Sequence, residues 1–289
     1  MSEALVSAVP ARRPIGVARF LRRNARIAIG GGIVLLMIVL ATAAPLFAGN
    51  PNAMNPMIRL EAPSAQYWFG TDNLGRDVFA RTLYGGQVSL AIGFSVAILA
   101  VAGGMLIGLL AGYYRRVDTL VMRLMDGLMA IPAILLAIAL VALTSGGIVI
   151  VVVAILIPEL PREVRLVRAI VLSAREQPFV EAAIAGGART RKILLRHILP
   201  STFAPLTVQG TYVCASSILV EAALSFLGAG VPPSIPTWGN MIASSQLYLG
   251  LAPWTIFFPG VALAVLVLAV NLLGDGLRDW LDPRLSRRQ

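Results

Sequence analysis

The sequence predicts an all-α membrane protein with six transmembrane helices and both chain ends on the cytoplasmic side (N-in/C-in). Of the 289 residues, 57% are hydrophobic and only 13% are charged, and the mean hydropathy is +0.81, which is too apolar for the surface of a soluble domain. The apolar residues form runs long enough to cross a hydrocarbon core of about 30 Å at about 1.5 Å per residue. The basic residues between these runs are distributed unevenly, which sets an orientation.

The first four spans follow from uncharged or nearly uncharged runs. Residues 27–47 carry no charge, and residues 88–114 are also uncharged, with glycines suited to close helix packing in lipid. The third span carries Pro132, which predicts a kink. The fourth continues through Glu159 and Glu163, because its uncharged part is only 14 residues long and would not cross alone. The four spans are residues 27–47, 88–114, 120–143 and 145–168.

The last two spans flank an apolar stretch that is too long for one helix. Residues 222–274 are 53 residues without a charge, and a cluster of prolines around position 233 divides them. The fifth span is therefore 202–227, with Glu221 as its one acid, and the sixth is 252–274. The remaining segments are an Arg-rich cytoplasmic tail (1–26), two external loops (48–87 and 228–251), a cytoplasmic loop (172–200) and a cytoplasmic tail (277–289).

The distribution of basic residues predicts the orientation. Of 24 basic residues, 21 fall in the segments that share a side with the N-terminus, and only Arg59, Arg76 and Arg81 fall on the other side. Cytoplasmic segments carry the excess of lysine and arginine, so both ends are predicted to be cytoplasmic. A cleavable signal peptide is the alternative for the start, because residues 41–43 resemble a cleavage site. The 26 residues before the apolar run and its full spanning length argue against cleavage.

Composition excludes several classes of function. The net charge is +10, but the basic residues border apolar segments and form no basic domain, which argues against nucleic-acid binding. The single cysteine, Cys214, permits no internal disulfide and is interpreted as an apolar filler, and the single histidine, His197, permits no zinc-protease motif. The only lysine, Lys192, follows Arg191, so the chain has no Walker A motif. A transporter, a channel or a structural membrane subunit remains.

The cytoplasmic loop at residues 172–200 is the most informative segment. Pro178 predicts the start of a short helix with a small, partly apolar face, and Gly186 and Gly187 predict its end. A second helical piece follows, apolar on one side and basic on the other. The loop is either an amphipathic segment on the membrane surface or a close-fitting knob for a cytoplasmic partner.

This loop resembles the EAA loop of bacterial ABC-importer permeases. Glu181-Ala182-Ala183, Gly187 and a later Leu-Pro pair carry the resemblance. In that family the loop contains a coupling helix that docks on the ATPase subunit. His197 departs from the broad pattern, which often has isoleucine there. The residues that the resemblance assigns to ATPase coupling are Glu181, Ala182, Ala183, Gly187, Arg191, His197, Leu199 and Pro200. From the residues alone, Glu181 could instead be an acidic residue in the first helical turn, where it interacts favourably with the helix dipole. Gly187 could be needed for the backbone conformation at the helix end.

Three further stretches resemble the dipeptide/oligopeptide/nickel branch of these permeases, specifically its C-type subunit. They are residues 69–90, 221–242 and 274–285. The resemblance implies the type I importer fold, with a five-helix permease core at 88–276. On the external, binding-protein side it marks Gly70, Thr71, Asp72, Gly75, Arg76, Asp77, Trp238 and Gly239. The charged members of the first group either pair with one another to shape the loop or meet the binding protein.

Three residues are candidates for an intramembrane or gating role. Asp126 lies one turn after Arg123, so an i,i+3 ion pair is the simpler interpretation and a role in gating is the alternative. Pro132 marks the expected kink. Glu221 is an acid toward the external end of a span, which indicates either function or a packing hydrogen bond to the partner subunit or to the loop at 228–250.

What the resemblance implies is a multi-pass subunit of the bacterial cytoplasmic (inner) membrane that is not itself an enzyme. A homologous permease would complete the pathway, two cytoplasmic ATPase subunits would bind ATP and Mg²⁺, and an extracytoplasmic protein would deliver a di- or oligopeptide. This chain would bind no cofactor. Nickel or another small solute is the alternative cargo. A structural subunit without a pathway and a secondary transporter are the alternatives from other classes.

Overall fold

The computed structural model of the chain describes residues 24–144 and 146–281. Most of both predicted tails (1–23 and 282–289) and Ser145, the first residue of the predicted fourth span, lie outside the described residues. Within these ranges all regular structure is helical, apart from one isolated bridge between Thr71 and Asp77. The all-α prediction is therefore confirmed.

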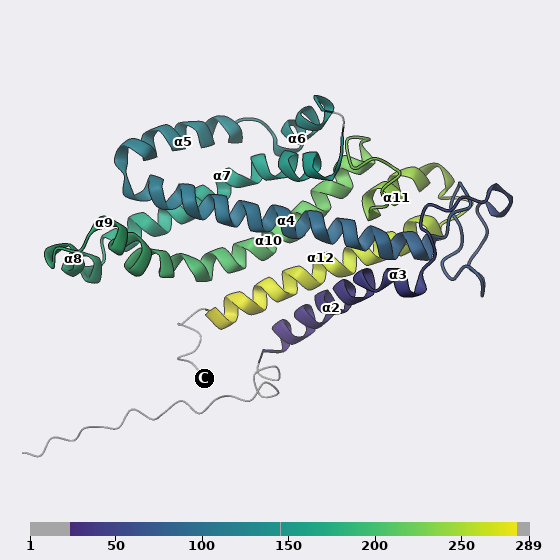
Figure 1. Ribbon diagram of the computed structural model, residues 1–289, viewed down its shortest axis with the longest axis horizontal. Helices are drawn as coiled ribbons and strands as arrows, with labels where there is room; N and C mark the ends of the chain where they lie inside the picture. Colours follow the sequence, from purple (N-terminus) through teal and green to yellow (C-terminus); the bar gives the residue numbers. More distant parts are fainter. Residues whose placement is uncertain (1–23, 145, 282–289) are drawn as a thin grey trace, which may run out of the picture.

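The long helices lie along one axis, with short elements at both ends (Figure 1). The long helices are α2 (Ala25–Thr42), α4 (Val78–Tyr113), α7 (Ile148–Arg175), α10 (Leu199–Phe226) and α12 (Trp254–Leu281). One end, called the α8 end, carries α8 (Pro178–Ala185), α9 (Thr190–Lys192) and the π-helical segment η2 (Ile193–Ile198). The other, called the loop end, carries α3 (Ala44–Phe47), η1 (Pro56–Ile58), α11 (Trp238–Ser245) and η3 (Gln246–Tyr248). The remaining two helices are α5 (Arg115–Met129) and α6 (Ala133–Ala142).

Four helices in the described residues are long and apolar enough to cross a membrane. These are α2, α4, the continuous helical run Thr190–Phe226, and α12, and the bent pair α5 and α6 makes a fifth if it counts as one span. Helix α7 is not among them, because it carries charged residues from Glu159 onward. At 28 residues, α7 is nevertheless about 42 Å long at about 1.5 Å per residue.

Two helices differ from the predicted spans for identifiable reasons. Helix α4 begins at Val78, ten residues before the predicted span, because Asp77 caps it: the Asp77 carboxylate accepts a hydrogen bond from the Phe79 amide. The predicted third span is two helices that meet at an angle of 86°. Pro132, which has no N–H and disfavours helical backbone at the residue before it, lies at this break as the N-cap of α6.

Close backbone contact joins α4 to α7. Glycines repeat every four residues on one face of α4, at Gly104, Gly108 and Gly112. A Cβ added to Gly108 would lie 2.6 Å from the Cβ of Val167, and one added to Gly112 would lie 2.6 Å from the Cβ of Val171. The two helices therefore run in parallel with little space for side chains between them, which is the small-residue packing used in membranes.

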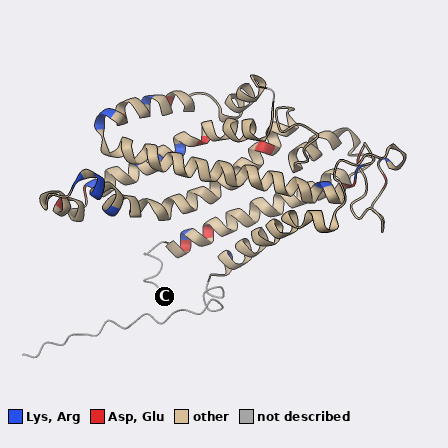
Figure 2. Ribbon diagram, viewed as in Figure 1, with Lys and Arg blue, Asp and Glu red and all other residues tan. Residues whose placement is uncertain are grey.

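The core is divided between the middle of the bundle and the α8 end. The smaller cluster, at the α8 end, contains Leu109, Val167, Val171, Ala174, Val180, Ile193, Ile198 and Leu206. Outward faces of the long helices expose large apolar side chains such as Leu35, Ile98 and Leu268, as expected where lipid or another subunit covers them. Lysine and arginine gather mainly at the α8 end (Figure 2).

Candidate functional site

Helix α8 has clear structural signals at both ends. Pro178 occupies its first turn, where the missing N–H costs no helical hydrogen bond. After Ala185, the chain closes with two hydrogen bonds, from the Gly187 amide to the Ile184 carbonyl (2.9 Å) and from the Ala188 amide to the Ala183 carbonyl (3.0 Å). This is a Schellman motif. It requires left-handed backbone at Gly187, whose φ is +73°, so this glycine serves the backbone shape.

Helix α8 packs against the rest of the chain through the side that carries Val180, and much of its remaining surface is exposed. Val180 is fully buried against the ends of α7 and η2. Ala183 is half-buried, whereas Glu181, Ala182 and Ala185 are exposed. At 100° per residue these three positions lie on the side of α8 away from Val180, although Ile184, nearer Val180, and Phe179 are exposed as well. Ala182 therefore belongs to the exposed side of α8, whereas the half-buried Ala183 lies nearer the side that carries Val180.

The second half of the predicted coupling loop leads directly into α10. Arg191 is exposed in α9, and His197 is half-buried in the π-helical segment η2. Leu199 and Pro200 form the first turn of α10. Short π-helical insertions are often found at functional sites, and this one lies where α8, α7 and α10 meet.

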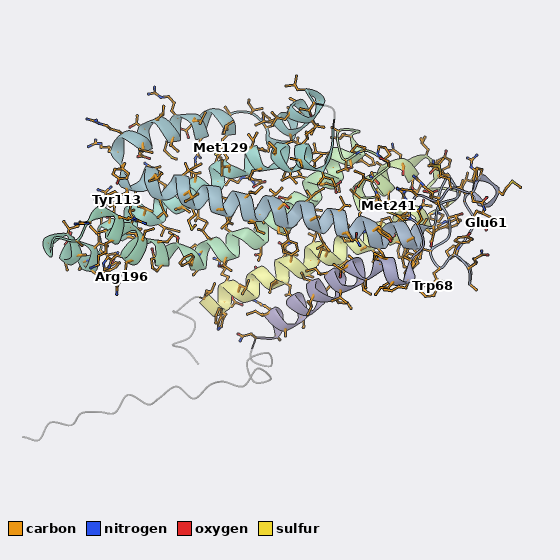
Figure 3. The ribbon with its side chains drawn as sticks, viewed as in Figure 1. Glu61, Trp68, Tyr113, Met129, Arg196 and Met241 are labelled. Atoms are coloured by element: carbon orange, nitrogen blue, oxygen red, sulfur yellow. The ribbon has the colours of Figure 1, made fainter. Side chains whose placement is uncertain are left out.

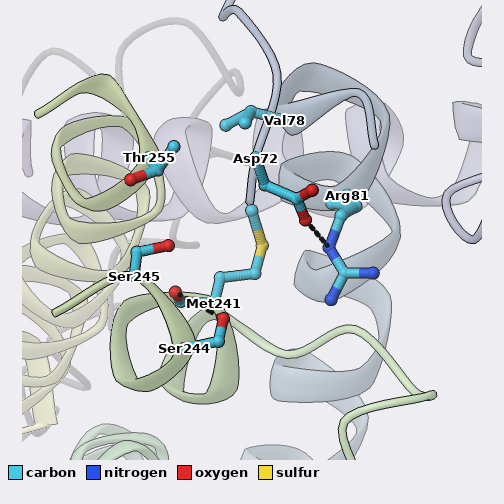
Figure 4. A pocket seen from close by; sticks show the side chains of 7 residues that line it. All are labelled: Asp72, Val78, Arg81, Met241, Ser244, Ser245 and Thr255. Carbon is cyan, nitrogen blue, oxygen red and sulfur yellow. Dashed lines mark hydrogen bonds and ion pairs between the residues drawn. The ribbon is translucent and has the colours of Figure 1, made fainter. Parts of the chain in front are cut away.

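At the loop end, the stretch Gly70–Asp77 is folded inward around a buried ion pair. Nε of Arg76 lies 2.6 Å from Oδ2 of Asp72, and Nε of Arg81 lies 3.8 Å from the same oxygen. All three side chains are at most 7% exposed. The Arg81 guanidinium also donates to the Pro51 carbonyl (3.2 Å) and to Oδ1 of Asn52 (3.3 Å). Asp72 and Arg81 border a small void that Met241 and Thr255 also line (Figure 4).

The other members of this stretch also make internal contacts. The Thr71 hydroxyl accepts from the Glu61 amide and donates to the Ile58 carbonyl. Gly75 has φ +70°, and an added Cβ would collide with the Asn55 carbonyl. Partial burial raises the pKa of the Asp77 carboxyl, although its hydrogen bonds from backbone amides act in the opposite direction. The stretch therefore shapes the loop, with Leu74 as its one exposed side chain. Other exposed side chains of the loop precede it: Met54, Met57, Glu61 and Trp68. Figure 3 labels Glu61 and Trp68.

Trp238 and Gly239 fix α11 to neighbouring helices. A capping box between Thr237 and Asn240 begins α11. Nε1 of the buried Trp238 donates to the Thr82 carbonyl of α4 at 2.8 Å. The backbone of Gly239 lies against Ala222 of α10, where an added Cβ would be 2.6 Å from Cα. Both residues thus hold the loop end together.

Glu221 is fully buried near the end of α10. Its Oε1 accepts a hydrogen bond from Oγ of Ser225 at 2.8 Å, and its Oε2 has no hydrogen-bond partner among the described residues. Ser225 in turn lies against Gly230 and lines a cavity of about 600 Å³ between α6, α10 and α11. Glu221 is therefore hydrogen-bonded to a residue that lines this cavity.

The expected pair between Asp126 and Arg123 is wrong. Asp126 of α5 instead lies 2.5 Å from Nη2 of Arg165 on α7, because α5 folds back alongside α7. A second pair joins the same helices, between Asp118 and Arg168. Sequence reasoning missed both arginines as partners, as well as the buried Arg81. No short-range spacing indicates such contacts, which depend on the packing of distant segments.

Comparison with known proteins shows that the chain is similar to permease components of transport systems. A family model described as binding-protein-dependent transport system inner membrane component matches residues 104–287. The chain is 58% identical over 273 residues to a probable peptide ABC transporter permease protein of Sinorhizobium fredii, with 94% of each chain covered. It is 43% identical over 268 residues to the dipeptide transport system permease protein DppC of Alkalihalophilus pseudofirmus, covering 92% of this chain and 88% of the relative.

The fold matches a solved structure as well. A chain of the inward-facing MetNI methionine ABC transporter aligns with a TM-score of 0.52 at 22% identity, covering 66% of this chain and 91% of that one. This likeness supports the expected type I importer fold of the helical core. The sequence matches identify the family: the chain belongs to the inner membrane components of binding-protein-dependent transport systems.

Proposed function

We propose that this permease subunit forms, with a homologous permease, the translocation pathway for di- or oligopeptides. The observation that carries the proposal is the identity of 58% over nearly the whole chain to a relative named for peptide transport. The second relative is named for dipeptide transport. Nickel or another small solute remains the alternative cargo, and a subunit without a pathway remains the alternative role.

The proposed membrane arrangement has six spans with both ends in the cytoplasm. The spans are α2, α4, the α5 and α6 pair, α7, α10 and α12, and the proposed membrane limits are residues 27–47, 88–114, 120–143, 145–168, 202–227 and 252–274. The concentration of lysine and arginine at the α8 end supports a cytoplasmic location for this end. Charged side chains of α7 would face protein, since exposure to lipid is costly.

Partners are proposed at both ends of the bundle. One of the two ATPase subunits, which bind ATP and Mg²⁺, would dock at α8 through its exposed face of Glu181, Ala182 and Ala185, while this chain binds no cofactor. A solute-binding protein would dock at the loop end. Because Gly70–Asp77 is folded inward, the exposed Met57 and Trp68 are better placed for that contact.

Reconstitution with the cognate partners tests the proposed cargo. Proteoliposomes that contain both permeases and both ATPase subunits, supplied with the binding protein, are expected to accumulate a labelled dipeptide only when ATP is present. Ni²⁺ in place of the dipeptide is the matched comparison. Accumulation of nickel without peptide would contradict the proposed cargo, and peptide uptake that is independent of ATP would contradict the importer mechanism.

Cysteine labelling tests the orientation. In a Cys214→Ala background, the Ser64→Cys and Ser234→Cys variants are expected to react with a membrane-impermeant maleimide on spheroplasts, because both positions are exposed at the loop end. An Arg189→Cys variant, at an exposed position near α8, is expected to react only after the membrane is permeabilised. Reaction of Arg189→Cys alone on sealed spheroplasts would reverse the proposed orientation.

A further inference from the structure

Within the α5–α6 arm, residues 115–142, helix α5 buries little apolar surface against the rest of the bundle. Met125 is the one buried residue of α5, whereas α6 buries Ala137 and Val141 in the main core cluster, which also contains Val151 and Ile155 of α7. The two helices meet at 86°. A helix such as α5, which buries so little apolar surface, depends more than other helices on its polar contacts for its position.

Two ion pairs supply these contacts to α5. Nε and Nη2 of Arg168 lie 2.5 and 2.8 Å from the two carboxylate oxygens of Asp118, which is the two-point geometry that gives arginine–carboxylate pairs directional strength. One turn away on α7, Arg165 binds Asp126. The Asp118–Arg168 pair is the less exposed of the two, with side-chain exposures of 21% and 32%.

The helix that carries both arginines continues without interruption toward α8. Val171 and Ala174 of α7 pack in the same cluster as Val180 of α8. Near the end of α7, Arg175 donates to the carbonyls of Gly112 and Tyr113, and its guanidinium lies 5.1 Å from the centre of the Tyr113 ring. A displacement of α8 would therefore move the end of α7 that carries the arginines.

The far end of the arm reaches the cavity of about 600 Å³ at the loop end. Val141 and Ala142 of α6 line this cavity together with residues of α10 and α11. A contiguous set of contacts thus runs from α8 through α7 and the ion pairs to α5, and through α6 to the cavity wall. The link between α5 and α6 is the chain itself, which bends at Pro132, and the other links are contacts between side chains.

We propose that Asp118, Asp126, Arg165 and Arg168 are positioning residues that tie the α5–α6 arm to α7, so that a movement imposed on α8 reaches the cavity wall. The proposal rests on the proposed function, because it requires that an ATPase subunit displaces α8. The inference adds that the α5–α6 arm is the element that transmits the displacement of α8. The competing interpretation is that these are ordinary surface ion pairs, which contribute little to stability and nothing to transport.

Charge reversal and charge exchange in the assembled importer separate these interpretations. The Asp118→Arg and Arg168→Asp variants are each expected to lower peptide uptake per ATP hydrolysed about tenfold, the loss that corresponds to one charge-assisted pair. Capture of the ATPase subunits should be unchanged, because α8 is untouched. The exchanged double variant, Asp118→Arg with Arg168→Asp, is expected to recover most of the uptake per ATP.

The exposed pair between Arg26 of α2 and Asp279 of α12 is the matched control, at 2.7 Å between Nη1 and Oδ2. Its reversal by Arg26→Asp should leave uptake per ATP unchanged, because neither helix belongs to the arm. If a reversed chain does not reach the membrane, the neutral Asp118→Asn and Arg168→Gln variants replace it, with a smaller loss expected.

Two results would overturn the proposal. One is unchanged uptake per ATP in both single variants, and the other is a loss that the exchanged variant does not repair. The proposed function would fail in a different way, through absence of ATP-dependent uptake or of ATPase capture with the wild-type chain. The two failures are therefore distinguishable in one set of measurements.

Discussion

The Ala182→Asp variant is expected to lose both capture of the ATPase subunits and peptide uptake, while the chain still folds and reaches the membrane. Ala182 is exposed, on the side of α8 opposite the buried Val180, so the new carboxylate meets water in the free chain. In the proposed interface the same carboxylate would be buried without a counter-charge. Such burial costs about 3 kcal/mol or more, equivalent to more than about 100-fold in affinity.

A matched control and a second variant sharpen this measurement. Ala25, also exposed, is the first residue of α2, where an aspartate favours the helix dipole, so Ala25→Asp should leave capture and uptake unchanged. Ala183→Asp is less informative, because the half-buried Ala183 faces the chain itself. Capture and uptake at wild-type levels with Ala182→Asp present in the membrane would show that α8 does not dock through its exposed face.

Three prolines and glycines in the sequence mark helix ends that hydropathy does not, although other prolines, such as Pro161 and Pro205, lie inside helices. Pro178 and Gly187 bracket α8, and Pro132 lies at the break between α5 and α6. Hydropathy missed the first ten residues of α4, because Arg81 and Gln87 interrupt the apolar run. A helix needs a cap and backbone hydrogen bonds to begin, and it continues through polar residues whose side chains find partners.

Contacts between distant segments could not be derived from spacing. The sequence offers Arg123 as the neighbour of Asp126, but the partner is Arg165, 39 residues away, and Asp118 pairs with Arg168, 50 residues away. Whether an acid bonds within its own helix or across to another depends on how α5 folds back along α7. The sharp bend at Pro132 is part of that geometry, and a proline alone does not specify its angle.

The sequence left two interpretations open for the charged residues of the Gly70–Asp77 stretch. It indicated that Asp72, Arg76 and Asp77 matter without indicating why. The structure favours the interpretation in which they shape the loop, because Asp72 and Arg76 are buried and paired with each other and Asp77 caps α4. The sequence did not indicate that Arg81 belongs to this buried group of charges. Arg81 is 2% exposed and shares the Asp72 carboxylate with Arg76.

This shared carboxylate leads to the second large expected effect, in which Asp72→Asn strongly destabilises the chain and Asp77→Asn does not. Asp72 is the counter-charge for two buried guanidinium groups, and its Oδ1 also accepts hydrogen bonds from the Leu74 and Arg76 amides. Asparagine keeps the shape of the side chain, but it removes the charge and adds a donor beside other donors. Loss of one partner from a buried ion pair costs about 3–5 kcal/mol.

Asp77→Asn makes the same chemical change five residues later, where the carboxylate acts as an N-cap and asparagine caps a helix about as well as aspartate. Its expected cost is therefore less than about 0.5 kcal/mol. The buried Cys214 provides the measurement, since a thiol reagent modifies it only when the core opens. In detergent, Asp72→Asn should bring the labelling transition to a markedly lower temperature than wild type, and Asp77→Asn should coincide with wild type. Equal transitions for all three chains would mean that Asp72 carries no structural role, and that this stretch is free to serve the binding protein instead.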